Sequence, residues 1–349
     1  MKHTHKRSVL FAIATATLAF PAMTELASAQ CVAGLGATAA QIGSQSWASS
    51  APRTAGDYTA IQTATANGPN TIKFVQPTLI KDSFIFDTGL NKVFHVTDFY
   101  PSTGELKGGE ALGPNGSIPI DAMNVAGDEW FLMSNNTLVA QLDVEESAAV
   151  KLDGKPVGFT YDGTYVWVAV DQALWQFSVP PADARTKVPT LVAKFQLPAK
   201  PTGELLFDGT AIWIPAGNSI FPFDTILDQA GPAFNLGGNI TKMVFDGVYL
   251  WVSEGTNANV SEFDPLKGQT VNNFITPSYA SSVAFDGSNL WVADSAISAL
   301  YKVRACDASR STVLPDTSFL KLGGPAATIY YDGTRKWVTY ANLPTVSIR

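Results

Sequence analysis

The chain of 349 residues has few of the side chains on which most catalytic centres depend. It contains three histidines and two cysteines, and 15% of its residues are charged. Only His95 among the histidines lies beyond the first 29 residues, so a Ser-His-Asp triad would have to use it. No Gly-x-Ser-x-Gly sequence accompanies His95. We therefore expect this histidine to be a structural or surface residue.

The chain also lacks long runs of one charge and long apolar segments. Its net charge of −7 is spread thinly along the sequence. This balance argues against nucleic acid or an anionic membrane surface as the main partner. The apolar run over residues 9–20 is too short to span a bilayer, and no later run is long enough. We therefore expect no membrane span.

The N-terminal residues are typical of a secretory signal peptide. A basic head over residues 2–7 precedes the apolar run, and the small residues Ala27-Ser28-Ala29 follow it. This order predicts a signal peptide over residues 1–29 and a mature chain that is periplasmic or secreted. A bacterial lipoprotein would need a small residue directly before Cys31, where this chain has Gln30.

The two cysteines are Cys31 and Cys306. In an oxidising compartment an isolated pair is most simply a disulfide, and one that closes so long a loop would stabilise the fold by several kcal/mol. The alternative is two unpaired thiols. Residues 30–69 are rich in Ala, Ser, Thr and Gly. They form either a strap held on the main domain by Cys31 or a flexible tether, and the cysteine favours the strap.

A motif recurs down most of the chain: an aromatic residue, Asp-Gly, three further residues, then Trp and an aliphatic residue. The aromatic residue and the Trp are six positions apart in each copy, and successive copies begin 46, 38, 40 and 46 residues apart. Repeats of about 40–50 residues built from short strands indicate the blades of a β-propeller. The copies begin at Tyr161, Phe207, Phe245, Phe285 and Tyr331.

Each repeat divides into four short strands. In one copy, residues 282–285 form a first strand, Asp286-Gly287 opens a turn, and residues 290–293 form a second strand. Residues 300–304 alternate apolar and polar side chains, as a half-buried third strand should. A fourth strand, such as residues 271–275, precedes the next copy. Four strands per repeat is the composition of a propeller blade.

Two further units depart from the motif. The stretch from Val125-Ala126-Gly127 to Phe131-Leu132 keeps the six-residue offset, with Ala in place of Asp and Phe in place of Trp. A first unit is identified by its third strand, because residues 96–101 match residues 260–265. With these two units the sequence predicts an all-β fold, a seven-bladed β-propeller of four-stranded blades.

The domain organisation follows from the repeat. We expect a signal peptide over residues 1–29, an N-terminal strap or leader over residues 30–69, and the propeller over residues 70–349. The last blade ends after its third strand at Arg349. An N-terminal strand within residues 58–65 is well placed to complete it, which would close the ring and cover both exposed sheet edges.

The repeat resembles that of the broad NHL and YVTN-type family of bacterial propellers, including the streptogramin-lyase-like group. Blades of that family carry a similar Asp-Gly followed by Leu-Trp-Val. The resemblance covers about residues 70–349 and implies the architecture alone, because the family mixes enzymes with many binding and scaffold proteins. The streptogramin-lyase-like enzymes rely on a catalytic histidine and a metal site, and that histidine maps onto no loop of this chain.

The repeated residues have a structural interpretation, since Asp-Gly favours a tight hairpin turn and Trp packs between blades. Functional residues should lie on loops that break the repeat. The turn after each second strand projects to one face of the ring, where four acids could converge on the central channel beside Asn257. Such oxygen ligands suit Ca²⁺ or another divalent cation, or a cationic or hydroxyl-rich ligand; the alternative is that they are simply solvated. The acids are Asp87, Asp171, Glu254 and Asp294.

These features favour an exported, non-catalytic propeller that binds a protein or a small ligand on one face of its ring, with no catalytic residue and no required cofactor. The alternative is a metal-dependent lyase or lactonase-like hydrolase that uses the acidic loops of the same face, since metal-carboxylate chemistry needs no histidine. A structural subunit of a surface assembly is a third interpretation. The identity of the ligand or partner does not follow from the sequence.

Overall fold

The computed structural model describes residues 128–140, 148–181, 188–287 and 289–305 as continuous segments, together with short segments that contain the remaining strands. Within these segments the regular structure consists mainly of β-strands, and the short 3₁₀ helix η4 (Gly255–Asn257) follows one of them. No helix in the described part of the chain is long and apolar enough to cross a membrane. The fold is therefore all-β, as the sequence predicts.

The strands form antiparallel sheets in which consecutive strands pair and are joined by turns. Most of the sheets have four strands. In chain order, the first three sheets consist of β2 (Ile72–Phe74), β3 (Phe84–Asp87), β4 (Lys92–His95) and β5 (Glu110–Ala111); of β6 (Pro119–Val125), β7 (Asp128–Met133), β8 (Thr137–Ala140) and β9 (Ala148–Lys151); and of β10 (Pro156–Tyr161), β11 (Tyr165–Val170), β12 (Ala173–Ser178) and β13 (Thr190–Gln196). The next two consist of β14 (Leu206–Phe207), β15 (Ala211–Ala216), β16 (Ser219–Asp224), β17 (Gln229–Ala230) and β18 (Phe234–Asn235); and of β19 (Ile240–Phe245), β20 (Leu250–Glu254), β21 (Asn259–Asp264) and β22 (Gln269–Ile275). The last two consist of β23 (Ala280–Phe285), β24 (Asn289–Asp294), β25 (Ala299–Arg304) and β26 (Phe319–Lys321); and of β27 (Ala326–Tyr331), β28 (Lys336–Tyr340) and β29 (Thr345–Ile348) with β1 (Thr59–Gln62).

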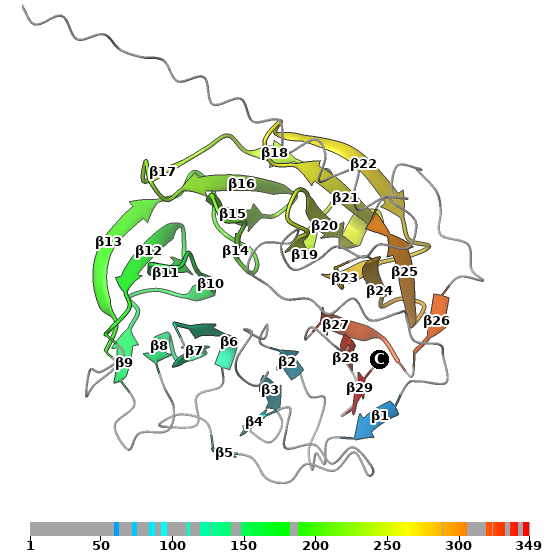
Figure 1. Ribbon diagram of the computed structural model, residues 1–349, viewed down its shortest axis with the longest axis horizontal. Coiled ribbons are helices and arrows are strands. Elements are labelled where there is room, and N and C mark those ends of the chain that lie inside the picture. Colours follow the sequence, from blue (N-terminus) through cyan, green and yellow to red (C-terminus); the bar gives the residue numbers. More distant parts are fainter. Residues whose placement is uncertain are drawn as a thin grey trace, which may run out of the picture.

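The sheets follow one another in sequence order around a common centre (Figure 1). The first strand of each sheet, such as β10, β19 and β23, lies nearest the centre, and the last strand, such as β13 or β22, lies at the periphery. Each sheet therefore presents its two faces to the sheets before and after it.

The last sheet includes a strand from the N-terminal part of the chain. β1 lies within residues 58–65, the segment from which we expect a completing strand, and it pairs antiparallel with β29. Thr59 lies opposite Ile348, and Gln62 lies opposite Thr345. Strands from the two ends of the sequence are thus neighbours in one sheet.

The hydrophobic core lies between adjacent sheets. Trp167 of β11 is fully buried, and its ring centroid is 5.5 Å from that of Phe223 in the following sheet. Trp213 of β15 repeats this contact, at 5.4 Å, with Phe263 of β21. Each such aromatic pair buries a large apolar surface, so the motif Trp joins its own sheet to the next one.

The Asp of the motif fixes both its turn and its Trp. In one copy, Oδ1 of Asp208 accepts hydrogen bonds from the backbone N–H groups of Thr210 and Ala211 at 2.7 and 2.8 Å. Its Oδ2 accepts the indole N–H of Trp213 at 2.7 Å. One carboxylate therefore closes the turn and pairs a buried indole donor, which explains the constant spacing of five residues between Asp and Trp. The same indole bond joins Asp162 to Trp167, Asp246 to Trp251 and Asp286 to Trp291, at 2.7, 2.8 and 2.6 Å.

In β6 and β7 the structure places the degenerate copy of the motif one residue earlier than its sequence indicates. Trp130, and not Phe131, occupies the place of the motif Trp, because it pairs with Met123 in the register that the motif Trp has in other sheets. Val125 then stands where the motif has Asp. The residue before it is not aromatic, so the sequence motif assigns the aromatic position to Val125, one residue too late. Since the side chain of Val125 has no acceptor, the buried indole nitrogen of Trp130 has no partner among the described residues.

This copy also places Ala126, with a φ of 52°, where the motif has Gly. Because a Cβ atom disfavours the left-handed region, we expect Ala126→Gly to raise the free energy of unfolding by about 1 kcal/mol. Ala211→Gly, at the start of strand β15, is a matched control and should lower it by about 0.5–1 kcal/mol. Urea unfolding of both variants measures these changes, and a loss of stability in Ala126→Gly would contradict the assignment.

Candidate functional site

The acids singled out in the sequence lie in different environments. Asp87 is the last residue of β3 and pairs with Ile72 and Lys92; its side chain lies outside what the structure describes. Cys31 and Cys306 also lie outside the described residues, so their disulfide remains a prediction. The other acids and Asn257 are described in full.

Glu254 is the last residue of β20 and is fully buried. Its Oε2 accepts the backbone N–H of Gly238 at 2.9 Å and the side-chain amide of Asn257 at 3.3 Å. Its Oε1 accepts the amide of Asn259 at 3.0 Å and the hydroxyl of Ser261. Both carboxylate oxygens are therefore occupied by donors of the same sheet and of the segment that enters it.

Asp294 and Asp171 make related contacts in other sheets. Asp294 ends β24 and is fully buried; its Oδ2 accepts the backbone N–H of Ser278 at 2.9 Å, and its Oδ1 accepts that of Ala296 at 3.1 Å. Asp171 follows β11 and is exposed, yet its Oδ2 accepts the backbone N–H of Lys155 at 3.3 Å. The donors Lys155 and Ser278 both precede the first strand of their sheet.

The three acids thus share one structural role. Each ties the turn after the second strand to the segment that leads into the first strand of the same sheet. In the described part of the chain, no hydrogen bond or ion pair joins Asp171, Glu254 and Asp294 to one another. Glu254 is brought into contact with Asn257, while Asp171 and Asp294 belong to separate sheets.

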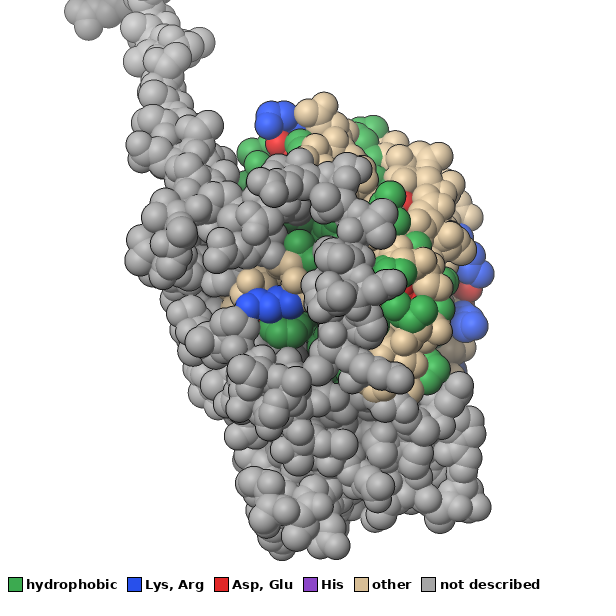
Figure 2. Space-filling model, turned by 90° about the vertical axis from the view of Figure 1, so that its right-hand side faces the viewer, with side chains coloured by type: hydrophobic (Ala, Val, Ile, Leu, Met, Phe, Trp, Pro, Cys, Tyr) green, Lys and Arg blue, Asp and Glu red, His purple; other side chains and the backbone are tan. Residues whose placement is uncertain are grey.

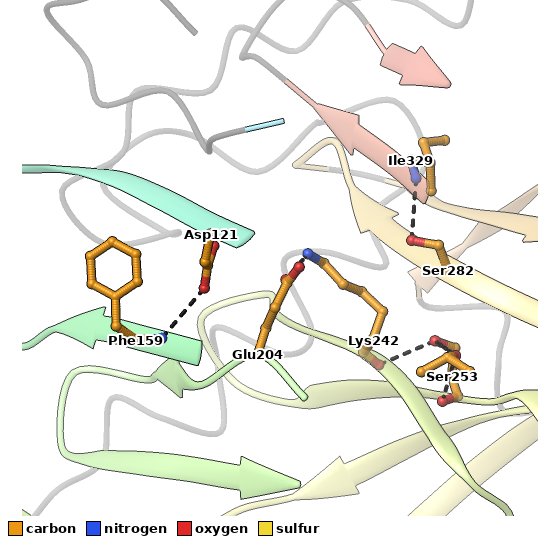
Figure 3. Close-up of polar contacts among 8 residues, drawn as sticks. Asp121, Phe159, Glu204, Lys242, Ser253, Ser282 and Ile329 are labelled. Atoms are coloured by element: carbon orange, nitrogen blue, oxygen red, sulfur yellow. Dashed lines mark hydrogen bonds and ion pairs between the residues drawn. The ribbon is translucent and has the colours of Figure 1, made fainter. Parts of the chain in front are cut away.

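A second set of polar residues lies on the innermost strands, nine residues before each Trp. A β-bulge precedes this position in several sheets, including those of Asp121, Lys242 and Ser282, and it turns the residue toward the neighbouring sheet. Asp121 accepts the backbone N–H of Phe159 at 3.4 Å, and Ser282 accepts that of Ile329 at 3.2 Å (Figure 3). The motif does not reveal these residues, but counting back nine positions from each Trp would have found them.

The same position carries an ion pair and a glycine in the intervening sheets. Glu204 and Lys242 form an ion pair between adjacent sheets, with 33% and 11% of their side chains exposed (Figure 3). A Cβ atom on Gly158 would lie 3.1 Å from Cα of Glu204, so the backbones approach closely there. These contacts fasten neighbouring innermost strands to each other around the centre of the molecule.

A buried carboxyl group with an unusual pKa lies between β20 and β22. Glu262 is 6% exposed and accepts the side-chain amide of Asn272 at 2.8 Å. Burial raises the pKa of Glu262 to about 7, and the nearby charges of Asp246 and Asp264 act in the same direction, while the bond from Asn272 opposes them. Glu262 therefore changes charge near neutral pH.

Glu262 makes stability depend on pH in a definite direction. Because its pKa is higher in the folded chain than the usual 4.5, its contribution is present below about pH 4.5 and is lost as pH rises through about 7. We expect Glu262→Gln to raise the free energy of unfolding at pH 8.5 by about 1–2 kcal/mol and to leave it nearly unchanged at pH 4. Denaturant unfolding at the two pH values tests this, and an equal effect at both would contradict it.

The peripheral surface carries a shallow groove. It has a volume of about 580 Å³ and lies between the end of β13 and the turn from β16 to β17. Exposed polar residues line it, among them Lys194, Gln196 and Asp228, while Leu197 and Phe223 beneath them are buried. We refer to it as the outer groove.

No family model and no curated protein matches the sequence. Among solved structures, one titled "Streptogramin B lyase structure" is similar, with 14% sequence identity, a TM-score of 0.64, and coverage of 83% of this chain and 97% of that chain. The fold is a β-propeller. The likeness agrees with the architecture that the repeat predicts, and each sheet of the propeller is a blade.

Proposed function

We propose that this propeller is a non-catalytic binding or scaffold protein that recognises a protein or a small ligand on the face formed by the turns after the second strands. The observation that carries the proposal is that, although Asp171 is exposed, the other two described acids of this face, Glu254 and Asp294, are fully buried and hold the backbone. The groups exposed beside them are neutral: Thr256, Asn257 and Ser278.

Neutral hydroxyl and amide groups recognise a partner by hydrogen bonds and not by charge. Such groups fit the backbone of a protein or a hydroxyl-rich ligand. The side of the molecule drawn in Figure 2 is consistent with weak charge in general, because its described surface carries few charged side chains.

We infer that the sheets are seven blades of one ring, closed where β1 pairs with β29, and that the propeller occupies residues 70–349. The basic head, apolar run and small residues at the N-terminus support export to the periplasm or the medium. A disulfide between Cys31 and Cys306 would hold the strap over residues 30–69 on the ring.

Binding by this face is tested with surface variants. The mature chain, with and without Thr256→Glu and Ser278→Glu, is immobilised and used to retain proteins or glycans of an envelope extract. We expect a retained partner that both replacements release, while Asn273→Glu, on the exposed outer strand β22, has no effect. A partner that is still retained by both Thr256→Glu and Ser278→Glu would contradict binding on the proposed face.

The second candidate is a metal-dependent lyase or lactonase-like hydrolase on the same face. It is favoured by the printed name of the similar structure, which is that of a lyase. It requires Asp171, Glu254 and Asp294 to be available to a divalent cation. Turnover of lactones or cyclic esters that depends on added Ca²⁺ or Mg²⁺, and that Glu254→Gln abolishes without unfolding the chain, would establish this candidate and overturn the binding proposal.

A further inference from the structure

Two neighbouring blades, those of β20 and β24, carry longer turns after their second strands than the two blades before them (Figure 1). In the blades of β11 and β15, the turn consists of residues 171–172 and 217–218. In the blades of β20 and β24, it consists of residues 255–258 and 295–298. Two residues are enough to join antiparallel strands, so the fold does not require the longer turns.

Buried acids hold both of the longer turns in a fixed shape. Asp294 accepts the backbone N–H groups of Ala296 and Ile297 with Oδ1, at 3.1 and 3.4 Å. Glu254 accepts the side-chain amide of Asn257 at 3.3 Å. Because a turn that is already fixed loses little conformational entropy when a ligand binds, these turns are suited to a preformed site.

Tyr279 lies between the two turns. A Cβ atom on Gly255 would lie 2.3 Å from Cζ of Tyr279, so the tyrosine ring rests directly on the first turn. The backbone carbonyl of Tyr279 accepts the N–H of Ser295, at the start of the second turn, at 3.2 Å. The side chain of Tyr279 is half-buried, which leaves part of it open to a ligand. We call residues 255–258, 277–279 and 295–298 the tyrosine patch.

The tyrosine patch is uncharged and combines polar with apolar groups. It contains no Asp, Glu, Lys, Arg or His. Thr256, Asn257 and Ser278 are exposed polar residues, and Ile297 is an aliphatic residue that is 38% exposed. Among the described residues, the hydroxyl groups of Ser278 and Tyr279 have no hydrogen-bond partner. Each of these hydroxyl groups can therefore both donate to a ligand and accept from it.

This combination of groups matches the chemistry of a sugar ring. A sugar ring has an apolar C–H face, which packs on an aromatic side chain, and a rim of hydroxyl groups that donate and accept hydrogen bonds. An extended peptide would instead need a free strand edge, and the strands that enter the two turns, β20 and β24, are paired on both sides. A charged ligand would find no opposite charge in the patch.

We propose that the tyrosine patch binds an uncharged glycan, with one sugar ring packed on Tyr279 and its hydroxyl groups bonded to Asn257 and Ser278. Ile297 extends the apolar contact on the second turn. The site depends on the proposed function, since it lies on the same face of the propeller, and Tyr279 makes that face selective for sugars.

Isothermal titration calorimetry of the mature chain tests the glycan site. The probes are neutral oligosaccharides of glucose, mannose, galactose and N-acetylglucosamine, with oligogalacturonate as the charged counterpart of the galactose series. We expect at least one neutral series to bind with a Kd below about 1 mM and oligogalacturonate to bind more weakly than the galactose series. Tyr279→Leu keeps an apolar side chain against Gly255 but removes the aromatic ring, and should raise the Kd about tenfold.

Tyr279→Phe keeps the ring and should change the Kd by less than about threefold, while Ser278→Ala should raise it about threefold. Gln196→Ala, in the outer groove, is the matched control and should leave the Kd unchanged. Circular dichroism establishes that each variant is folded.

The outcomes separate the glycan site from the proposed function. Binding that survives Tyr279→Leu, or oligogalacturonate that binds as tightly as the neutral series, would overturn the glycan site. If no neutral oligosaccharide binds while Thr256→Glu and Ser278→Glu still release a retained protein, the glycan site is wrong and the proposed binding face stands. If neither a glycan nor a protein is bound, both are wrong.

Discussion

Replacing Asp286 with alanine is expected to lower the free energy of unfolding by about 3 kcal/mol. Asp286 is 2% exposed, and its carboxylate accepts the indole N–H of Trp291 at 2.6 Å and the backbone N–H of Asn289 at 2.8 Å. Without it, a buried indole donor and the turn lose their acceptor. The loss exceeds that of an ordinary hydrogen bond, because the donors remain buried and unpaired.

Urea unfolding followed by tryptophan fluorescence measures this loss. Asp153→Ala is the matched control, since Asp153 is an exposed aspartate on the loop before β10, and it should change stability by less than 0.5 kcal/mol. If Asp286→Ala behaved like the control, the Asp-to-Trp bond would not be what maintains the repeated spacing.

Replacing Glu254 with alanine should be at least as harmful, with an expected loss of about 3–4 kcal/mol. The variant leaves four donors without their acceptor, from Gly238, Asn257, Asn259 and Ser261, and it opens a small cavity. A residue that served only to bind a ligand would show little loss of stability, or even a gain, when removed. The size of this effect therefore separates a structural role from a binding role.

Two further variants calibrate the result. Glu254→Gln keeps one acceptor oxygen and the volume of the side chain, so it should cost about half as much as Glu254→Ala. Asp171→Ala removes a single bond of 3.3 Å at an exposed position and should cost less than 1 kcal/mol. Thermal unfolding ranks the three variants, and a Glu254→Ala protein as stable as Asp171→Ala would contradict the structural role.

The sequence predicts the architecture well because most blades repeat the same short-range pattern of residues. The hairpin turn and the buried Trp depend on residues five or six positions apart, and such short spacings survive as a visible motif. The degenerate copy is predicted less well. Trp130 is displaced by one position from the expected place, and only the strand register, in which it lies opposite Met123, reveals this.

The candidate site is harder to predict for a physical reason. Glu254 and Asp171 look alike in sequence, since each lies where a second strand ends, yet one is fully buried and the other exposed. Burial depends on how the entering segment folds over the turn. One donor to Glu254 is Gly238 in that segment, where a Cβ atom would lie 2.9 Å from Cβ of Glu254. Contacts of this kind join residues far apart in the chain and leave no periodic signal.

We expect the buried acids Glu254 and Asp294 to hold the propeller together and to bind no cation. Titration of the mature chain with Ca²⁺ while following its Tm tests this most directly, because a ligand that binds the folded chain raises Tm. We expect a wild-type Tm that is independent of millimolar Ca²⁺ and a Tm that falls in Glu254→Ala. A rise in Tm with Ca²⁺ in the wild type that disappears in Glu254→Gln would contradict it.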